Sequence, residues 1–358
     1  MQFWSYLFTT GAVVAAVLAI GLWQRQVNRR ANRLLAAWLI VLFLDLAARA
    51  WYLGSGSDLS VKAYGIVQFF PFIHGSALFL YVSLLTRDRP LRWTDLHVLL
   101  GFIVVVALNF PVFFHSAEQT RQLLNGTGGG TFWFRYFDHT LFTYSLSYVA
   151  AALVVLTRHH QALLAQRSDA VVDQLAWVRM LAFWQLSIWG MAVLQNLVSW
   201  VSVHAIYATV TIWLLLFGSF SVREGAVPAV AKPSTEKSLP PSPRWDRVEQ
   251  RLLQLINEQA IYTQAELTIA QLAERVGAPE YLVSAVINQR FGQTFYDFIN
   301  GHRVQAACQR LVEEPQTNIL DIALDCGFAS KTTFNTVFKR QTSMTPSAWR
   351  RQALAEVA

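Results

Sequence analysis

A stretch near the carboxyl end of the chain, residues 331–342, combines side chains that suit the reading of nucleic-acid bases. If the stretch is helical, its spacing places four residues on one side: Phe334, Val337, Phe338 and Gln341. The opposite side then carries small hydrogen-bonding groups and a cation: Thr332, Asn335, Thr336 and Lys339. Hydroxyls and amides can read base edges in a major groove, while lysine attracts phosphate. We therefore interpret this side as a candidate DNA-reading surface.

A second short helix and a tight turn must position this surface. Ile319, Ile322 and Ala323 recur at helical spacing, which predicts one apolar face against a core. Gly327 permits a turn that a residue with a Cβ would resist, and Ser330 can cap the following helix. The pattern predicts a helix, a turn and a helix, although such pairs also occur as plain packing units.

The chain upstream repeats this pattern, which favours the DNA-binding interpretation. Ile269, Leu272 and Ala273 mirror the three apolar residues of the later helix, and Gly277 mirrors its turn glycine. The outward side of this earlier reading helix is expected to hold Tyr281, Ser284, Ala285 and Asn288. Two such units can enter successive major grooves if their reading helices lie about 34 Å apart. A rigid pair that misses this spacing would have to bend the DNA.

Two stretches of this chain are LTIAQLAERVGAPEYLVSAVINQRFGQTFYDFINGHRVQAACQRL and NILDIALDCGFASKTTFNTVFKRQTSMTPSAWR. Together they resemble the DNA-binding domain of the AraC/XylS transcription regulators. The resemblance implies two helix-turn-helix units joined by a long helix, expected at Phe295–Val312. It also implies activation more often than repression, and a homodimer on repeated half-sites. Double-stranded promoter DNA and RNA polymerase are the expected partners. The chain departs from the usual pattern at Ser343, where glycine is common, and at Cys326, where a small apolar residue is usual.

Ten residues are predicted to contact DNA. Seven are expected at base edges or in their immediate neighbourhood: Tyr281, Ser284, Asn288, Lys331, Thr332, Asn335 and Thr336. Three are expected on phosphates: Lys339, Arg340 and Arg350. The segment between Gly327 and Leu354 contains no acidic residue, which gives the local basic face that phosphate contact requires. The net charge of +7 is a poor guide here, because residues 244–358 hold 12 basic and 12 acidic side chains.

The first two thirds of the chain are unusually apolar. The apolar fraction of the whole chain, 54%, exceeds the roughly 45–50% of ordinary globular chains, and the excess precedes Ser221. Seven segments have about the 20 residues that cross a bilayer as a helix: Met1–Trp23, Leu34–Leu53, Tyr64–Leu85, Leu96–Phe114, Trp133–Leu156, Trp177–Leu197 and Val201–Phe220. We therefore expect an all-α protein with a seven-helix transmembrane sensor domain in residues 1–221, a proline-rich linker in 222–243 and a DNA-binding domain in 244–358.

Basic residues alternate between the predicted loops. They follow the first, third and fifth spans: Arg25, Arg29, Arg30, Arg33, Arg87, Arg89, Arg92, Arg158 and Arg167. Cytoplasmic loops collect lysine and arginine, so the amino terminus is expected in the periplasm and the carboxyl-terminal domain in the cytoplasm. This orientation at a bacterial inner membrane lets the domain reach a chromosome. No cation precedes the first apolar run as in a secretory signal, so we interpret it as a retained span.

Ionisable residues inside the predicted spans are candidates for sensing, because they are costly there and often functional. These candidates are Asp45, Arg49, His74, Arg135, Asp138 and His139. They could line an outward-facing pocket for a polar ligand, or they could pair, cap and snorkel to hold the bundle. The signal is left open between a small molecule and another membrane protein. An alternative function is a transporter or membrane enzyme with a DNA-binding tail, which predicts a broken, charged helix near the bilayer midplane.

The sequence indicates no enzyme, cofactor or metal site. Cys308 and Cys326 lack metal-binding spacing, and Cys326 is expected as a small buried residue in preference to a redox sensor. His159 and His160 are expected at the surface of a basic loop. The glycine-rich segment 126–130 lacks the GK[ST] of a phosphate-binding loop and is interpreted as a flexible outer loop.

The helix predicted at Arg244–Glu258 is expected to open the carboxyl-terminal domain. Pro243 suits the first turn of a helix, and an apolar stripe follows it: Val248, Leu252, Leu255 and Ile256. The stripe is no wider than one buried face needs, which favours packing in the core. A contact between two copies of the chain is the alternative.

Overall fold

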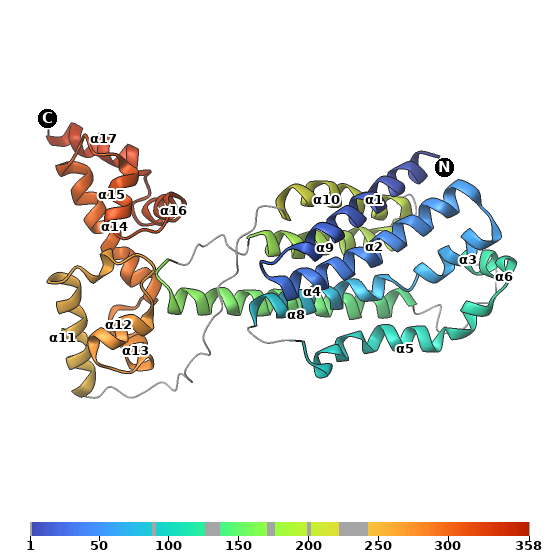
Figure 1. Ribbon diagram of the computed structural model, residues 1–358, viewed down its shortest axis with the longest axis horizontal. Helices are drawn as coiled ribbons and strands as arrows, with labels where there is room; N and C mark the ends of the chain where they lie inside the picture. The colour runs from blue at the N-terminus through green and yellow to red at the C-terminus, as the bar shows by residue number, and fades with distance from the viewer. Residues whose placement is uncertain are drawn as a thin grey trace. The chain divides into compact units, whose positions relative to one another are not determined.

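The computed structural model describes residues 2–87, 91–125, 137–169, 176–198, 202–221 and 243–357. Every regular element in these ranges is helical (Figure 1). The chain divides into two compact units. The first holds Met1–Thr157 and Leu175–Ala229, and the second holds Arg158–Gln174 and Val230–Ala358. The expected all-α class is therefore confirmed for the described residues.

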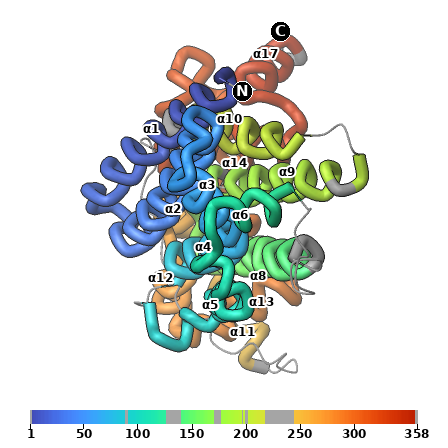
Figure 2. Tube along the Cα trace, turned by 90° about the vertical axis from the view of Figure 1, so that its right-hand side faces the viewer, coloured from blue at the N-terminus to red at the C-terminus, as the bar shows by residue number. Residues whose placement is uncertain are grey.

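The first unit is a bundle of apolar helices (Figure 2). Its main helices are α1 (Gln2–Gln24), α2 (Arg29–Ser55), α3 (Asp58–Val67), α4 (Pro71–Thr86), α9 (Ala176–Leu197) and α10 (Val203–Ser221), with the first part of α8 (Phe137–Gln166). Between α4 and α8, the described residues form four shorter elements: η1 (Trp93–Leu99), α5 (Leu100–Leu108), η2 (Phe110–Phe114) and α6 (Ala117–Leu124). Helix α2 packs against α1, α3 and α4, while α10 packs against α1 and α9.

Small residues let the helices of this bundle approach closely. A Cβ on Gly11 of α1 would lie 2.6 Å from the hydroxyl oxygen of Thr211 on α10. A Cβ on Gly75 of α4 would lie 2.6 Å from the backbone oxygen of Ser145 on α8. Close backbone approach at small residues is typical of helices that pack in a membrane, where lipid supplies no hydrophobic force between them.

Among the described helices, four are long and apolar enough to cross a membrane, namely α1, α2, α8 and α9. The pair α3 and α4 would add a fifth span, bent by 45° at its break. The predicted fourth span coincides with η1, α5 and η2, and the seventh with α10; their apolar helical stretches, Trp93–Leu108 and Val203–Leu216, are shorter. The described residues thus contain a helix at every predicted span, while the count of seven stays a prediction.

The second unit is built around a core of buried apolar side chains. Its helices are α11 (Pro243–Asn257), η3 (Ile261–Thr263), α12 (Ile269–Val276), α13 (Glu280–Phe291), α14 (Phe295–Glu313), α15 (Ile319–Asp325), α16 (Lys331–Thr342) and α17 (Pro346–Val357). The apolar stripe of α11 is buried in one cluster with α12, α13 and α14. The prediction that this helix packs in the core is confirmed. The long helix expected at Phe295–Val312 is found as α14, one residue longer.

Candidate nucleic-acid interface

Helices α15 and α16 form the predicted pair of helices around a tight turn. Asn318 caps α15 by accepting a hydrogen bond from the backbone N–H of Leu320 at 2.9 Å. Ser330 caps α16 by accepting from the backbone N–H of Thr333 at 3.2 Å. Between the two helices, Gly327 has φ = +90°, in the left-handed region that favours glycine. The local sequence therefore determines where each helix begins and how the chain turns between them.

The two sides of α16 differ as its spacing predicts. Phe334, Val337 and Phe338 are buried, and the rings of the two phenylalanines pack edge to face at 5.3 Å. Five residues that were predicted to contact DNA are exposed: Lys331, Thr332, Asn335, Thr336 and Lys339. Gln341 was placed on the apolar side by its spacing, but it is exposed. It lies near the carboxyl end of the helix, at the edge of the apolar stripe, where a polar side chain can turn to solvent.

Helices α12 and α13 repeat this arrangement earlier in the chain. Thr268 caps α12 by accepting from the backbone N–H of Gln271, and Gly277 ends the helix with φ = +75°. On α13, Tyr281 is 40% exposed and Asn288 is also exposed. The Asn288 side-chain amide donates to the hydroxyl of Ser284 at 3.4 Å. Ser284 is half-buried, so this helix offers a smaller set of exposed polar groups than α16.

Two of the predicted phosphate-binding arginines already have partners inside the domain. Arg340 forms an ion pair with Asp297 of α14 at 2.6 Å. Arg350 donates to the backbone oxygen of Thr317 at 2.8 Å and to that of Pro315 at 3.2 Å. These contacts tie α16 to α14 and α17 to the loop that precedes α15. The structure therefore gives both arginines a role in holding the domain together.

A buried arginine at the centre of α14 was not predicted from the sequence. The guanidinium of Arg303 is fully buried and donates to the backbone oxygens of Tyr262 at 2.7 Å and Gln264 at 2.8 Å. Burial lowers the pKa of Arg303 to about 10, while the charge of Asp169 opposes this shift. The ring of Phe328, in the turn before α16, lies 5.7 Å from the same guanidinium. Arg303 thus joins the loop before α12 to the turn before α16.

Arg303 also holds the segment that follows α8. The backbone oxygen of Ser168 accepts from the Asn300 side-chain amide at 2.8 Å and from Arg303 at 3.3 Å. The backbone N–H of Ser168 donates to the oxygen of Leu267, directly before α12. Ser168 is fully buried by these contacts. Sequence reasoning placed Ser168 in a cytoplasmic loop, because nothing in its own neighbourhood points to partners about 100 or more residues away.

Helix α8 extends beyond its predicted end, and one histidine in this extension differs from its predicted position. The predicted span ends at Leu156, whereas α8 continues to Gln166. His159 was expected at the surface of a basic loop, but it lies within α8, on a side of the helix that is buried. The expectation of a surface position for His159 was therefore wrong.

The cysteines of the second unit behave as small apolar residues. Cys326 is buried, as expected, and burial raises its pKa. Burial also raises the pKa of Cys308 to about 11. Because the thiolate is the reactive form, both shifts oppose oxidation and metal binding. Within the described ranges, no cluster of histidine, cysteine and carboxylate side chains could hold a metal ion.

The candidate sensing residues are divided between different surroundings. Asp45 and Arg49 of α2 form an ion pair at 2.8 Å with both side chains buried, and the Arg49 guanidinium lies 3.6 Å from the ring centre of Tyr207. His74 of α4 accepts a hydrogen bond from the indole N–H of Trp38 at 2.9 Å. The remaining candidates cannot be placed, because Arg135 and the side chains of Asp138 and His139 lie outside the described residues.

Comparison with known proteins identifies the carboxyl-terminal part of the chain. A family described as "Helix-turn-helix domain" matches residues 272–352, which include α13 to α16. The chain is 31% identical over 116 residues to the "HTH-type transcriptional activator RhaR" of Escherichia coli strain K12 and of Shigella flexneri serotype 5b. The match covers 32% of this chain and 39% of each relative.

The chain thus spans about two fifths of the length of these curated relatives. No solved structure matches it. The matched region contains the caps, turns and exposed polar residues described above for α13 to α16. The carboxyl-terminal part of the chain is therefore a DNA-binding domain of the AraC type.

Proposed function

We propose that this protein is a membrane-tethered transcription regulator that binds promoter DNA through two helix-turn-helix units, α12 with α13 and α15 with α16. The observation that carries this proposal is the exposed face of α16, where amide, hydroxyl and ammonium groups stand beside one another on a helix with a buried opposite side. Such a helix can enter a major groove without exposing its core. The curated relatives are named as transcriptional activators, which supports a role in regulating transcription.

The exposed residues of the two units divide into two groups by chemistry. Base edges are assigned to Asn335, Thr336 and Thr332 on α16, with Tyr281 and Asn288 on α13, because their groups donate and accept hydrogen bonds. Lys331 and Lys339 are assigned to phosphate contacts, because their positive charge attracts DNA of any base sequence equally. Arg340 can join them if it leaves Asp297, since an exposed ion pair of this kind is worth only about 0–1 kcal/mol.

The apolar unit is assigned to a bacterial inner membrane, with seven spans, a periplasmic amino terminus and the DNA-binding domain in the cytoplasm. Four long apolar helices, the bent pair and two shorter apolar helices support this assignment. Arginines follow every second span, as the positive-inside rule requires for this orientation. RNA polymerase and a second copy of the chain are the further partners that an activator on repeated half-sites needs.

Control of the domain by the membrane unit is assigned to α8. This helix contributes Phe137–Thr157 to the first unit and continues into the second, where Ser168 is fastened to Asn300, Arg303 and Leu267. A displacement of α8 along its axis would therefore act on α14 and on the start of α12. These elements support the two reading helices, so such a displacement would alter how both fit DNA.

The alternative of a transporter or membrane enzyme has less support. It predicts a broken helix that carries charge near the middle of the membrane. The chain does break between α3 and α4, at 45°. However, the buried ion pair of Asp45 and Arg49 lies within α2, a continuous helix of 27 residues. The Arg49 guanidinium lies 5.1 Å from the ring centre of Tyr64 on α3, before the break, but neither charged residue of the pair lies on the bent helices themselves.

DNA selection with the full chain in lipid nanodiscs tests the proposal. Asn335→Ala should relax the preferred sequence at one or two positions, because it removes an amide that reads a base edge. Lys339→Ala should weaken binding to all sequences and reduce the slope of log K against log salt by about one. Lys62→Ala, an exposed lysine in the first unit, is the matched control and should leave both properties unchanged.

Two results would contradict the proposal. The first is a full chain that binds no duplex more tightly than the Lys339→Ala variant does. The second is an Asn335→Ala variant whose sequence preference equals that of the unmodified chain.

A further inference from the structure

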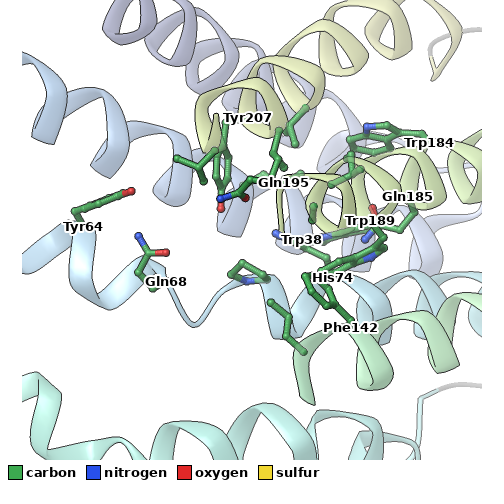
Figure 3. A pocket seen from close by; sticks show the side chains of 18 of the residues that line it. Trp38, Tyr64, Gln68, His74, Phe142, Trp184, Gln185, Trp189, Gln195 and Tyr207 are labelled. Atoms are coloured by element: carbon green, nitrogen blue, oxygen red, sulfur yellow. Dashed lines mark hydrogen bonds between the residues drawn. The ribbon is translucent and has the colours of Figure 1, made fainter. Parts of the chain in front are cut away.

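The largest described cavity lies inside the first unit and is lined by residues of α2, α3, α4, α6, α8, α9 and α10 (Figure 3). Its volume is about 420 Å³, within the range of about 300–1,000 Å³ that is typical of pockets for small molecules. Six aromatic side chains line it: Trp38, Tyr64, Phe142, Trp184, Trp189 and Tyr207. In Figure 3, Trp38, Phe142 and Trp189 gather at one end, while Tyr64 stands at the other. The walls therefore offer several flat surfaces for stacking.

The polar groups of the cavity carry no full charge, because its one imidazole, that of His74, accepts the Trp38 N–H through Nδ1 and is therefore neutral. Three amides line it, those of Gln68, Gln185 and Gln195, and no aspartate, glutamate, lysine or arginine stands among its described lining residues. Arg49 lies behind Tyr207 and is held by Asp45. A charged ligand would lose its hydration without gaining a counter-ion here, which makes its entry costly. A neutral ligand avoids this cost.

One hydrogen-bond donor of the cavity wall is left without a partner. Trp189 is 4% exposed, and its indole N–H donates to no group within the described residues. The neighbouring Trp38 differs, because its indole N–H donates to His74 at 2.9 Å. An indole can only donate, so a ligand that reaches the Trp189 N–H can supply the acceptor that the described residues lack. A buried donor without an acceptor costs free energy that such a ligand would recover.

We propose that this cavity binds a neutral, flat, lipophilic molecule that carries a carbonyl oxygen. The ring of the molecule would stack among the aromatic walls, and its carbonyl would accept a hydrogen bond from Trp189. Such molecules concentrate in lipid bilayers, so they reach a membrane-embedded site from the bilayer itself. The proposal deepens the sensor role assigned above and rests on it only for the consequence of binding, not for binding itself.

Helix α8 connects this site to the proposed output. Leu141 and Phe142 of α8 form part of the cavity wall, and the ring of Phe142 packs edge to face against Trp189 at 6.1 Å. A ligand beside Trp189 therefore also lies beside α8. The same helix ends next to Ser168, whose backbone is bound by α14. Occupation of the cavity thus acts on the helix that reaches the DNA-binding domain.

The test uses the fluorescent ketone 6-propionyl-2-dimethylaminonaphthalene as the probe. It is neutral, flat and lipophilic, and its emission reports both polarity and hydrogen bonding to its carbonyl. The probe is titrated into the full chain in nanodiscs, and the signal from empty nanodiscs is subtracted. Saturable binding is expected. The emission of the bound probe should be blue-shifted relative to the probe in water, because the cavity is apolar. Binding that equals the empty-nanodisc signal would overturn the proposal.

Three variants locate the site. Trp189→Phe keeps a ring but removes the donor, so it should raise the Kd roughly five- to tenfold, the effect of one hydrogen bond. Trp51→Phe, at an exposed tryptophan of α2 away from the cavity, is the matched control and should leave the Kd unchanged. Ala192→Phe should abolish binding, because it places a ring inside the cavity. Equal affinity in Trp189→Phe and the control would overturn the role of the indole N–H.

Competition tests the ligand class. 2-Acetylnaphthalene, a neutral ketone, should displace the probe, whereas 2-naphthoate, with the same rings and a negative charge, should not. Displacement by 2-naphthoate at equal concentration would overturn the neutral class. DNA binding is measured on the same samples, so its retention without probe binding refutes only the cavity. Probe binding by a chain that ignores all duplexes refutes only the regulator.

Discussion

At the scale of single residues, the cations that were predicted to contact DNA differ in how freely they can reach it. Lys331 and Lys339 are exposed on α16, whereas Arg340 pairs with Asp297 and Arg350 binds two backbone oxygens. The Arg340 pair is exposed and weak, so phosphate can compete for that guanidinium. Arg350 satisfies backbone groups of the loop before α15, and its departure would leave them without these donors. We therefore rank the lysines first for phosphate contact, Arg340 next and Arg350 last.

Two turn glycines give a matched test of how the domain is assembled. Gly277 and Gly327 both have positive φ, so alanine at either position costs roughly 1–2 kcal/mol of backbone strain. At Gly277 nothing lies within 4 Å of the added Cβ, whereas at Gly327 it would lie 2.5 Å from the backbone oxygen of Tyr262. Gly327→Ala should therefore destabilise the domain more than Gly277→Ala does. Hydrogen exchange of the α16 amides in the full chain measures the difference.

Equal exchange rates in the two glycine variants would contradict the close packing of the Gly327 turn against the backbone of Tyr262. The larger effect at Gly327 should appear as faster exchange in α14 and α16 together. This result is expected because the loop of Tyr262 also receives the Arg303 hydrogen bond, which a displaced loop would lose.

Sequence spacing predicted the residues whose roles depend on near neighbours. The Ser330 cap, the Gly327 turn and the two sides of α16 follow from residues within one helical turn. The roles of Arg303 and Ser168 could not be predicted in this way, since the backbone oxygens that Arg303 binds, that of Ser168 among them, lie 39 to 135 residues away. The sequence shows only that Arg303 is a cation within the long predicted helix. The spacing of the apolar residues did not indicate that this side chain is buried.

At the scale of elements, hydropathy located the apolar helices but not their breaks. Each predicted span of the first unit coincides with a helix or a broken set of helices. The third span divides where Pro71 begins α4, and the fourth divides at Asn109, whose side chain donates to the oxygen of Val105. Both interruptions lie inside continuous apolar sequence, so a hydropathy average cannot detect them.

The contact of α14 with Ser168, two residues after the end of α8, can be tested by limited proteolysis. Asn300→Ala removes the 2.8 Å hydrogen bond to the Ser168 oxygen, which should loosen the segment around Arg167. Tryptic cleavage after Arg167 in the nanodisc-bound chain should then accelerate roughly five- to tenfold, as expected for the loss of one buried hydrogen bond. Gln309→Ala, at an exposed position of the same helix, is the control. Identical cleavage of both variants would argue against the proposal that α8 controls the DNA-binding domain through Ser168.

At the scale of the whole molecule, the chain passes between its two units three times. It leaves the first unit after Thr157, returns at Leu175 and leaves again after Ala229. The sequence predicted only the last of these crossings, as a proline-rich linker in residues 222–243. That linker lies almost entirely outside the described residues. The two earlier crossings were not predicted, because Ser168 binds the second unit through contacts that are distant in sequence.

The number of spans decides which side of the membrane each segment occupies. With seven spans and a cytoplasmic carboxyl terminus, alkaline phosphatase should be active when fused after Ser57 or Asn125, since both positions follow an even-numbered span. A fluorescent protein, which folds in the cytoplasm, should be bright when fused after Arg87 or Ala358. The pair Ser57 and Arg87 flanks α3 and α4 and therefore tests whether the bent helices cross the membrane.

Opposite results at Ser57 and Arg87 are expected if α3 and α4 together form one span. Equal results would remove that span and, with a cytoplasmic carboxyl terminus, would transfer the amino terminus to the cytoplasm. A phosphatase signal after Ala358 would exclude regulation of a chromosome by this chain, because the DNA-binding domain would then lie in the periplasm. The exposed face of α16 can act as proposed only if that last fusion is bright and lacks phosphatase activity.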